Sequence, residues 1–134
     1  GISVSFEDGI LIATRGYSQD LIESEHGNLN NLFDLSSKRR EKTYRYLSGQ
    51  NGYEELKFSC TISVKKNTTP QILLDIKLKT TQLTEICVSE ISSHTNLYYL
   101  LPDTKIVLKS KQWVSQTNGY ILCYNYYAFQ NNLY

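Results

Sequence analysis

Methionine is absent from this chain of 134 residues, and proline, histidine and tryptophan are scarce, with two, two and one residues respectively. Two prolines, seven glycines and 20% charged residues exclude a collagen-like, low-complexity or disordered chain. No hydrophobic run approaches the length of a membrane span, and the N-terminus lacks the charged-then-apolar order of a signal peptide. These absences leave one folded domain, residues 1–134, that is rich in tyrosine.

A dominant charge is also lacking, since the formal net charge is +1. No overall field favours nucleic acid, an anionic membrane or an acidic substrate, so we predict no nucleic-acid partner. One run, Ser36–Lys42, concentrates basic residues in a way that is typical of a phosphate-contacting patch. Because no other charges extend this run into a stripe, we interpret it as a solvated loop.

Cysteine is too sparse for a disulfide framework or a zinc site. Cys60, Cys87 and Cys123 are an odd number at wide spacings without a C-x-x-C pair, so at most one disulfide can form. Each falls in a predicted strand, which favours a small buried hydrophobic residue over a redox or metal role. We predict no metal ion and no cofactor.

Catalytic motifs are missing as well. The sequence has no glycine-rich phosphate loop, no G-x-S-x-G elbow and no H-E-x-x-H pair. His26 and His94 lie at no metal-ligand spacing from a cysteine or a carboxylate, and a pair of His94 with Cys87 requires the intervening turn to bring them together. We therefore predict that the protein is not an enzyme.

Alternation of apolar and polar residues is the strongest signal present. Leu56–Val64 carries apolar side chains at every second position, and Leu74–Leu78 repeats the pattern after a turn that ends at Pro70. Such alternation is typical of antiparallel strands with one wet face, and we expect these two strands to pair. Asn67, in the turn, begins a glycosylation tripeptide, a pattern that is common by chance.

Two segments depart from simple strands. The spacing of apolar residues in Leu21–Leu35 suits one or two helical turns, so we expect a loop with a short helix there. The apolar residues of Thr80–Glu90 change parity partway, which predicts a bulge or bend near Glu85. The other predicted strands are Ile2–Phe6, Ile10–Ala13, Thr43–Leu47, Leu97–Leu101 and Lys105–Leu108.

The C-terminal stretch, Lys111–Tyr134, has the pattern of a hairpin. Asn118 and Gly119 supply its turn, and Tyr120–Phe129 is rich in the aromatic residues that strands favour. Together with the alternation, this predicts an all-β fold. We expect an antiparallel meander of about eight to ten strands in a sandwich or half-barrel, with one short helical or irregular segment.

Aromatic side chains are the candidates for binding. Tyrosine and tryptophan present a flat apolar face with a hydrogen-bonding edge, which suits stacking on sugars and contacts with partner proteins. We select Trp113, the only tryptophan, with Tyr120, Tyr124 and Tyr126 of the C-terminal hairpin. The alternative for each is packing within the core or the sheet.

Two segments resemble a known family. Phe6–Leu21 has the order aromatic residue, Asp-Gly, apolar run, threonine, glycine and Asp-Leu, and Trp113–Ile121 has the order Trp-Val, polar turn, Gly-x-Ile. Both are similar to segments of the group 4 capsule polysaccharide lipoproteins, and the chain departs from that pattern at Cys123 and Tyr124. Arg15, within the first segment, completes the candidate binding set.

The resemblance implies an outer-membrane-associated periplasmic lipoprotein with a curved antiparallel sheet. Such a protein assists capsule or exopolysaccharide secretion by binding a polysaccharide or an envelope secretion protein, and meets the membrane only through a lipid anchor that has been removed. The start at Gly1 inside a strand-like pattern also leads us to expect a mature fragment that lacks a leader and early strands. The alternative is an extracellular protein–protein interaction module such as an adhesin, toxin subunit or viral surface domain.

Overall fold

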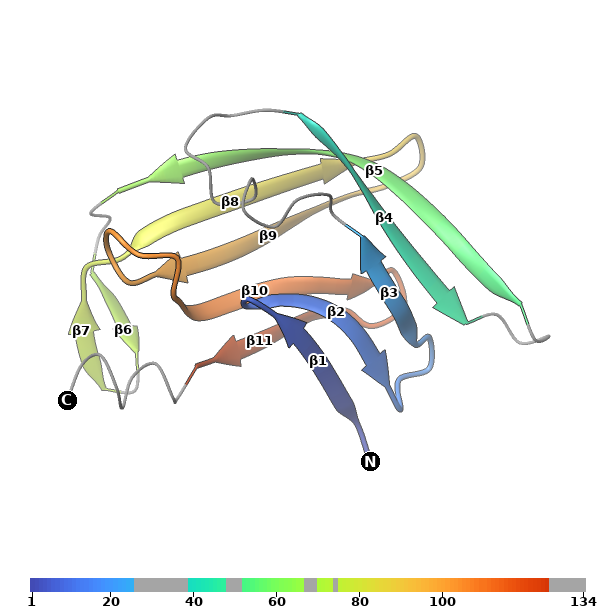
Figure 1. Cartoon of the computed structure of the whole chain (residues 1–134), viewed down its shortest axis with the longest axis horizontal. Helices are drawn as coiled ribbons and strands as arrows, with labels where there is room; N and C mark the ends of the chain where they lie inside the picture. Colours follow the sequence, from blue (N-terminus) through green and yellow to red (C-terminus); the bar gives the residue numbers. More distant parts are fainter. Residues whose placement is uncertain (26–38, 48–51, 67–69, 74, 126–134) are drawn as a thin grey trace.

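The computed structural model describes residues 1–25, 39–47, 52–66, 70–73 and 75–125. These ranges contain β-strands but no helix, and therefore none that is long and apolar enough to cross a membrane. Figure 1 shows one large sheet and two small hairpins, β1–β2 and β6–β7. The strands are β1 (Ser3–Glu7), β2 (Ile10–Arg15), β3 (Leu21–Glu25), β4 (Arg40–Leu47), β5 (Tyr53–Lys65), β6 (Gln71–Leu73), β7 (Ile76–Leu78), β8 (Thr81–Val88), β9 (Ser93–Leu100), β10 (Val107–Ser115) and β11 (Gly119–Tyr124).

The large sheet has the strand order β11-β10-β9-β8-β5-β4-β3, and every neighbouring pair is antiparallel. Neighbours in the sheet are also consecutive in the chain, except that the β6–β7 hairpin is inserted between β5 and β8. The sheet curls from β3 to β11 around the β1–β2 hairpin (Figure 1). The predicted all-β antiparallel meander is therefore confirmed, and of the two expected forms, sandwich or half-barrel, the sheet has the second. The described residues contain eleven strands, slightly more than the eight to ten expected.

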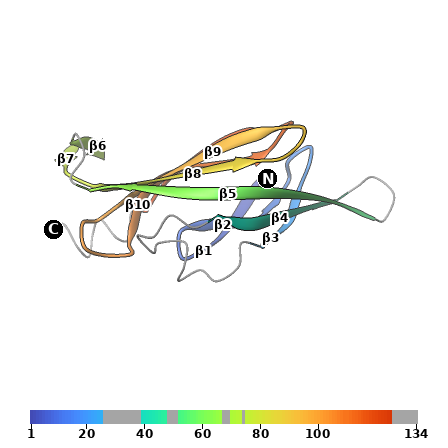
Figure 2. The same cartoon turned by 90° about the horizontal axis from the view of Figure 1, so that it is seen from above.

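The β1–β2 hairpin covers the inner face of the curled sheet (Figure 2). At its turn, Gly9 has a φ of +83° and lies so close to β10 that a β-carbon would come within 2.7 Å of Val107. The Gln112 side chain accepts a hydrogen bond from Leu11 N at 2.9 Å and donates one to Gly9 O at 2.8 Å. Because Gln112 is buried, these bonds hold the hairpin firmly against β10.

The apolar core lies between this hairpin and the sheet. In β5, Phe58, Cys60 and Ile62 are buried and the residues between them are more exposed, which confirms the alternation predicted for Leu56–Val64. The core continues through the neighbouring strands as two large clusters, and a third, smaller cluster surrounds Leu108, with Tyr124 packed against it. The first contains Leu11, Leu21, Tyr44, Tyr46, Phe58, Cys60, Cys87, Trp113 and Val114, and the second contains Ile10, Ile62, Leu83, Tyr98, Leu100 and Val107.

Two segments of the N-terminal half differ from the prediction. Leu21–Glu25 forms β3, the edge strand of the sheet, where the sequence predicts a loop with a short helix. The remainder of that segment lies outside the described residues. Strand β4 begins at Arg40, ahead of the predicted Thr43, so the end of the basic run is not a solvated loop. Lys42 is buried on the inner face because it pairs there with Glu85.

Two predictions for the middle of the chain are also wrong. Strand β8 pairs with β5 and β9 in unbroken register, without a bend near Glu85. The apolar parity changes because Glu85 occupies the inner face, while Ile86 is 47% exposed on the outer face. The strand predicted to return along β5 instead belongs to the β6–β7 hairpin, with Asp75 at a φ of 64° between the two strands. Leu74 and Asn67 lie outside the described residues.

The C-terminal hairpin is confirmed as far as the structure describes it. β10 and β11 pair from Lys109 with Tyr124 to Ser115 with Gly119, and Gly119 has the positive φ, 70°, that the turn requires. The register shifts between Trp113 and Ser115. The part of the predicted strand beyond residue 125 lies outside the described residues.

Candidate functional site

Tyrosine and lysine side chains gather on the outer face of β9, β10 and β11. Side chains alternate along a strand, so the neighbours of core residues point away from the core. Tyr99 follows the buried Tyr98, and the two lysines of β10 flank the buried Ser110. The outward residues that we call the tyrosine–lysine face are Tyr99, Lys109, Lys111, Tyr120 and Tyr124.

Each lysine of this face lies over at least one tyrosine ring. Lys109 Nζ is 5.6 Å from the centroid of the Tyr99 ring and 5.5 Å from that of the Tyr124 ring. Lys111 Nζ is 5.2 Å from the centroid of the Tyr120 ring. Such cation–π contacts contribute about 0.5–1 kcal/mol each at exposed sites, and they hold both partners in place.

Strand pairing also positions these rings. Lys109 is the register partner of Tyr99 on β9 and of Tyr124 on β11. The Tyr120 hydroxyl reaches across to β9, where it accepts a hydrogen bond from Thr95 N at 3.1 Å. The rings therefore form a surface that is ordered before any ligand arrives, which lowers the entropic cost of binding.

The tyrosine–lysine face is open to water. Tyr120 is 40% exposed, and Leu122 between the two β11 tyrosines is 55% exposed. A hollow of about 560 Å³ adjoins the face, and its lining includes Lys109, Leu122 and Tyr124 together with Phe6 of β1. The face thus offers flat rings, exposed apolar surface and two cations over three strands.

Trp113, the first of the predicted binding residues, lies in the core instead. It is 6% exposed, and its ring stacks on that of His94 with the centroids 4.1 Å apart and the planes 8° from parallel. Tyr44 and Phe58 pack edge-on against the indole, with centroids at 5.1 Å and 5.5 Å. Trp113 is therefore a core residue, which is the alternative to a binding role, and its ring offers no open face to a ligand.

The other predicted residues divide between the face and elsewhere. The structure brings Tyr120 and Tyr124 together on the tyrosine–lysine face. Arg15 is exposed at the end of β2 and lines a separate hollow of about 900 Å³ whose lining residues come from β1 to β4 and contain no tyrosine. Tyr126 lies outside the described residues. A binding role for Arg15 stays a prediction.

A group of buried charged residues that the sequence pattern does not predict lies on the inner face. Glu85 is fully buried and accepts hydrogen bonds from Lys42 Nζ at 3.1 Å, from Asn96 Nδ2 at 2.8 Å and from Arg40. Burial opposes the charged carboxylate, but Lys42 and Arg40 outweigh it and lower the pKa of Glu85 to about 2. The change in apolar parity along β8 is the signal that could have located this group, because it arises where Glu85 takes an inward position.

His94 on β9 is the register partner of Cys87 on β8, because the turn between these strands brings the two residues together. Its Nε2 lies 3.1 Å from the Tyr44 hydroxyl, and its buried Nδ1 has no hydrogen-bond partner among the described residues. Burial, with the charge of Lys42, lowers the pKa of His94 to about 4, so the ring is neutral at neutral pH. Cys87 carries no free thiol, so the two residues do not form a nucleophile–base pair in this structure.

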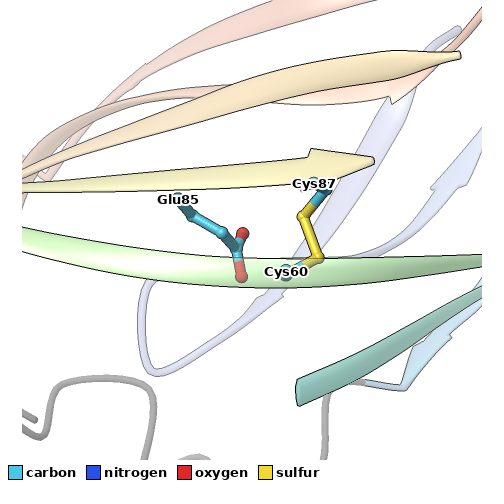
Figure 3. Close-up of side chains that lie close together, drawn as sticks. All are labelled: Cys60, Glu85 and Cys87. Carbon is cyan, nitrogen blue, oxygen red and sulfur yellow. A yellow bond between two sulfur atoms is a disulfide. The ribbon is translucent and has the colours of Figure 1, made fainter. Parts of the chain in front are cut away.

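Cys60 and Cys87 form a disulfide with an S–S distance of 2.04 Å. Both are buried, as predicted, but as a bonded pair of register partners on β5 and β8, and Cys123 is the free thiol. The Glu85 carboxylate lies on the same side of the sheet, and its ligand atom and the two sulfurs are within 4.8 Å of one another (Figure 3). Because the sulfurs are bonded and Lys42 holds the carboxylate, this set offers no thiolate to a metal ion.

Comparisons with known proteins identify a family and a similar fold. A family model described as "Group 4 capsule polysaccharide lipoprotein gfcB, YjbF" matches residues 2–123. The crystal structure of the hypothetical lipoprotein YmcC from Escherichia coli (K12) has a similar fold, with a TM-score of 0.62 at 16% sequence identity. The match covers 85% of this chain and 63% of YmcC, so the chain spans less than two thirds of that relative. No curated protein matches the chain.

Proposed function

The chain belongs to the group 4 capsule polysaccharide lipoprotein family, and from this membership we propose that it is a non-enzymatic protein that assists polysaccharide secretion by binding glycan. The family relates the chain to capsule polysaccharide and to the cell envelope, which favours this function over an adhesin, a toxin subunit or a viral surface domain. The glycan is bound on the tyrosine–lysine face.

The observation that carries the proposal is the grouping of Tyr99, Tyr120 and Tyr124 on one outer surface. Sugar rings present an apolar face of C–H groups and a hydroxyl edge, and a tyrosine matches both with its ring and its hydroxyl. Rings on three adjacent strands can contact successive sugars of a chain, so a polymer would gain affinity by contacting several of them together.

The proposed compartment is the periplasm, with the protein attached to the outer membrane only through a lipid anchor. The buried Cys60–Cys87 disulfide supports this proposal, because structural disulfides persist in oxidising compartments such as the periplasm and are rare in the cytosol. A periplasmic surface is also where a secreted polysaccharide would meet the tyrosine–lysine face.

Alanine variants of the three tyrosines test the glycan proposal. We expect Tyr99→Ala, Tyr120→Ala and Tyr124→Ala each to weaken binding to purified capsular polysaccharide about fivefold, which corresponds to about 1 kcal/mol for a lost stacking contact. Tyr53→Ala is the control, since Tyr53 is 64% exposed at the far end of β5. Affinity electrophoresis measures the binding. Unchanged retardation of folded variants, or an equal effect of Tyr53→Ala, would mean that the rings only pack the sheet.

A second candidate function, contact with an envelope secretion protein, is favoured by β1. Ile2, Val4 and Phe6 are 65%, 37% and 36% exposed, and among the described residues β1 pairs only with β2. An unpaired apolar edge is a site where a partner can add a strand. Under this candidate, Val4→Lys would reduce polysaccharide export by cells while the purified protein still binds glycan. Normal export by a Val4→Lys strain would eliminate it.

A further inference from the structure

The two lysines of the tyrosine–lysine face carry charge that no acidic side chain in the described part of the chain neutralises. Neither Lys109 nor Lys111 forms an ion pair within the described ranges. Cations on other strands do, because Arg45 pairs with Glu23 at 2.6 Å and Lys57 lies 3.7 Å from Glu55. The positive charge of the face is therefore available to an external anion.

Acidic side chains are absent from this part of the sheet. Strands β9, β10 and β11 contain no aspartate or glutamate, and Asp103, in the turn between β9 and β10, is the only acid in the sequence from residue 91 onward. The outward residues of the adjoining strand β8 include Thr84 and Ile86, which are uncharged. A local positive surface thus exists in a chain whose net charge is only +1.

The lysines stand where they can contact a ligand that stacks on the tyrosines. They are two residues apart on β10, so their α-carbons are separated by about 7 Å along the strand. Each ammonium lies over a tyrosine ring, 5.2 Å to 5.6 Å from the centroid. A sugar that lies on a ring would therefore bring its substituents close to an ammonium group.

From these observations we infer that the ligand of the tyrosine–lysine face is an acidic polysaccharide, whose carboxylate or phosphate groups contact Lys109 and Lys111. This inference rests on the proposed glycan-binding function and specifies its substrate class. The rings supply contacts that any sugar can make, and the lysines supply selectivity for a charged chain over a neutral one.

A polymer whose charge can be removed chemically tests the inference. The probes are polygalacturonate and its fully methyl-esterified form, which share one sugar backbone and differ in charge. We expect the protein to bind the acid form about tenfold more tightly, and the preference to fall as salt rises from about 50 to about 300 mM, because added ions screen exposed charges. Isothermal titration calorimetry measures both affinities.

Glutamine variants assign the selectivity to these lysines. We expect the Lys109→Gln, Lys111→Gln double variant to lose most of the preference, with affinity for the acid form reduced about tenfold and affinity for the ester unchanged. Lys57→Gln is the matched control, since Lys57 is an exposed strand lysine that is already paired with Glu55. Fluorescence of the buried Trp113 confirms that each variant is folded.

The possible failures of the two proposals can be separated. Equal binding of both polymers, lost in Tyr99→Ala, would overturn the acidic class and leave the glycan-binding function standing. Binding of neither polymer would overturn both. Lysine-dependent binding to phosphatidylglycerol vesicles that is tighter than binding to polygalacturonate would overturn the inference in favour of an anionic membrane surface.

Discussion

Replacement of Glu85 by glutamine should destabilise the fold more than neutralising any other single charged residue that the structure describes. The substitution keeps the size of the side chain but leaves Lys42 and Arg40 beside a neutral amide. Lys42 has 3% of its side chain exposed and Arg40 has 17%, so neither cation can recover full hydration without unfolding. Removing one partner of such a buried group costs about 3–5 kcal/mol.

The pKa of Glu85 gives a second measure of the same interaction. Its folded pKa of about 2 lies below the ordinary value of 4.5, so the unfolded chain binds the proton more tightly. The difference corresponds to about 3 kcal/mol of stability, which is fully present above pH 4.5 and lost as the pH falls toward 2. In the Glu85→Gln variant this acid-dependent loss should disappear, so the two proteins should approach equal stability at low pH.

Urea unfolding followed by fluorescence measures both effects, because Trp113 is the only tryptophan and is buried. Glu23→Gln is the control, since Glu23 pairs with Arg45 at a side-chain exposure of 55%, where an ion pair contributes at most about 1 kcal/mol. A loss below about 1 kcal/mol for Glu85→Gln, or an unchanged acid dependence, would refute the claim that this group is a stabilising buried ion network.

Two further predictions concern the disulfide and the hairpin. The Cys60→Ala, Cys87→Ala double variant should have a free energy of unfolding about 3.5 kcal/mol lower, because the disulfide closes a loop across a sequence separation of 27. Equal urea midpoints for the reduced and the oxidised wild-type protein would contradict this. Gly9→Ala should lower the thermal midpoint more than Gly119→Ala, because both sites have positive φ but only at Gly9 would the new β-carbon meet Val107, at 2.7 Å. Val107→Ala should partly rescue Gly9→Ala, and equal effects of the two glycine substitutions would show that no steric contact is involved.

Local pattern predicted the fold wherever apolar residues mark the inner face. In β5 the alternation is complete, and Phe58, Cys60 and Ile62 are buried as expected. It failed in β8, because the inward position belongs to Glu85, a residue that hydrophobic periodicity places in water. The partners that make this burial favourable come from β4 and β9, and a window along one strand contains no information about them.

The aromatic residues show the same limit for the candidate site. Tyr120 and Tyr124 lie on the surface and Trp113 lies in the core, although all three belong to one hairpin. In β10, Gln112, Trp113 and Val114 are consecutive buried residues, so alternation cannot sort them. The register between β10 and β11 shifts beside Trp113, and such irregularities depend on the neighbouring strands rather than on residue type.

The hydrogen bonds of Gln112 to the β1–β2 hairpin affect how the chain folds. The bonds from Leu11 to Gln112 and from Gln112 to Gly9 join residues 101 and 103 positions apart. Contacts between such distant parts of a chain form late and slow folding, because a long loop must close first. During synthesis, the β1–β2 hairpin therefore cannot form its bonds to Gln112 until β10 has emerged. We expect truncation before Gln112 to leave the β1–β2 segment open to proteases, which limited proteolysis of such a truncated chain would reveal.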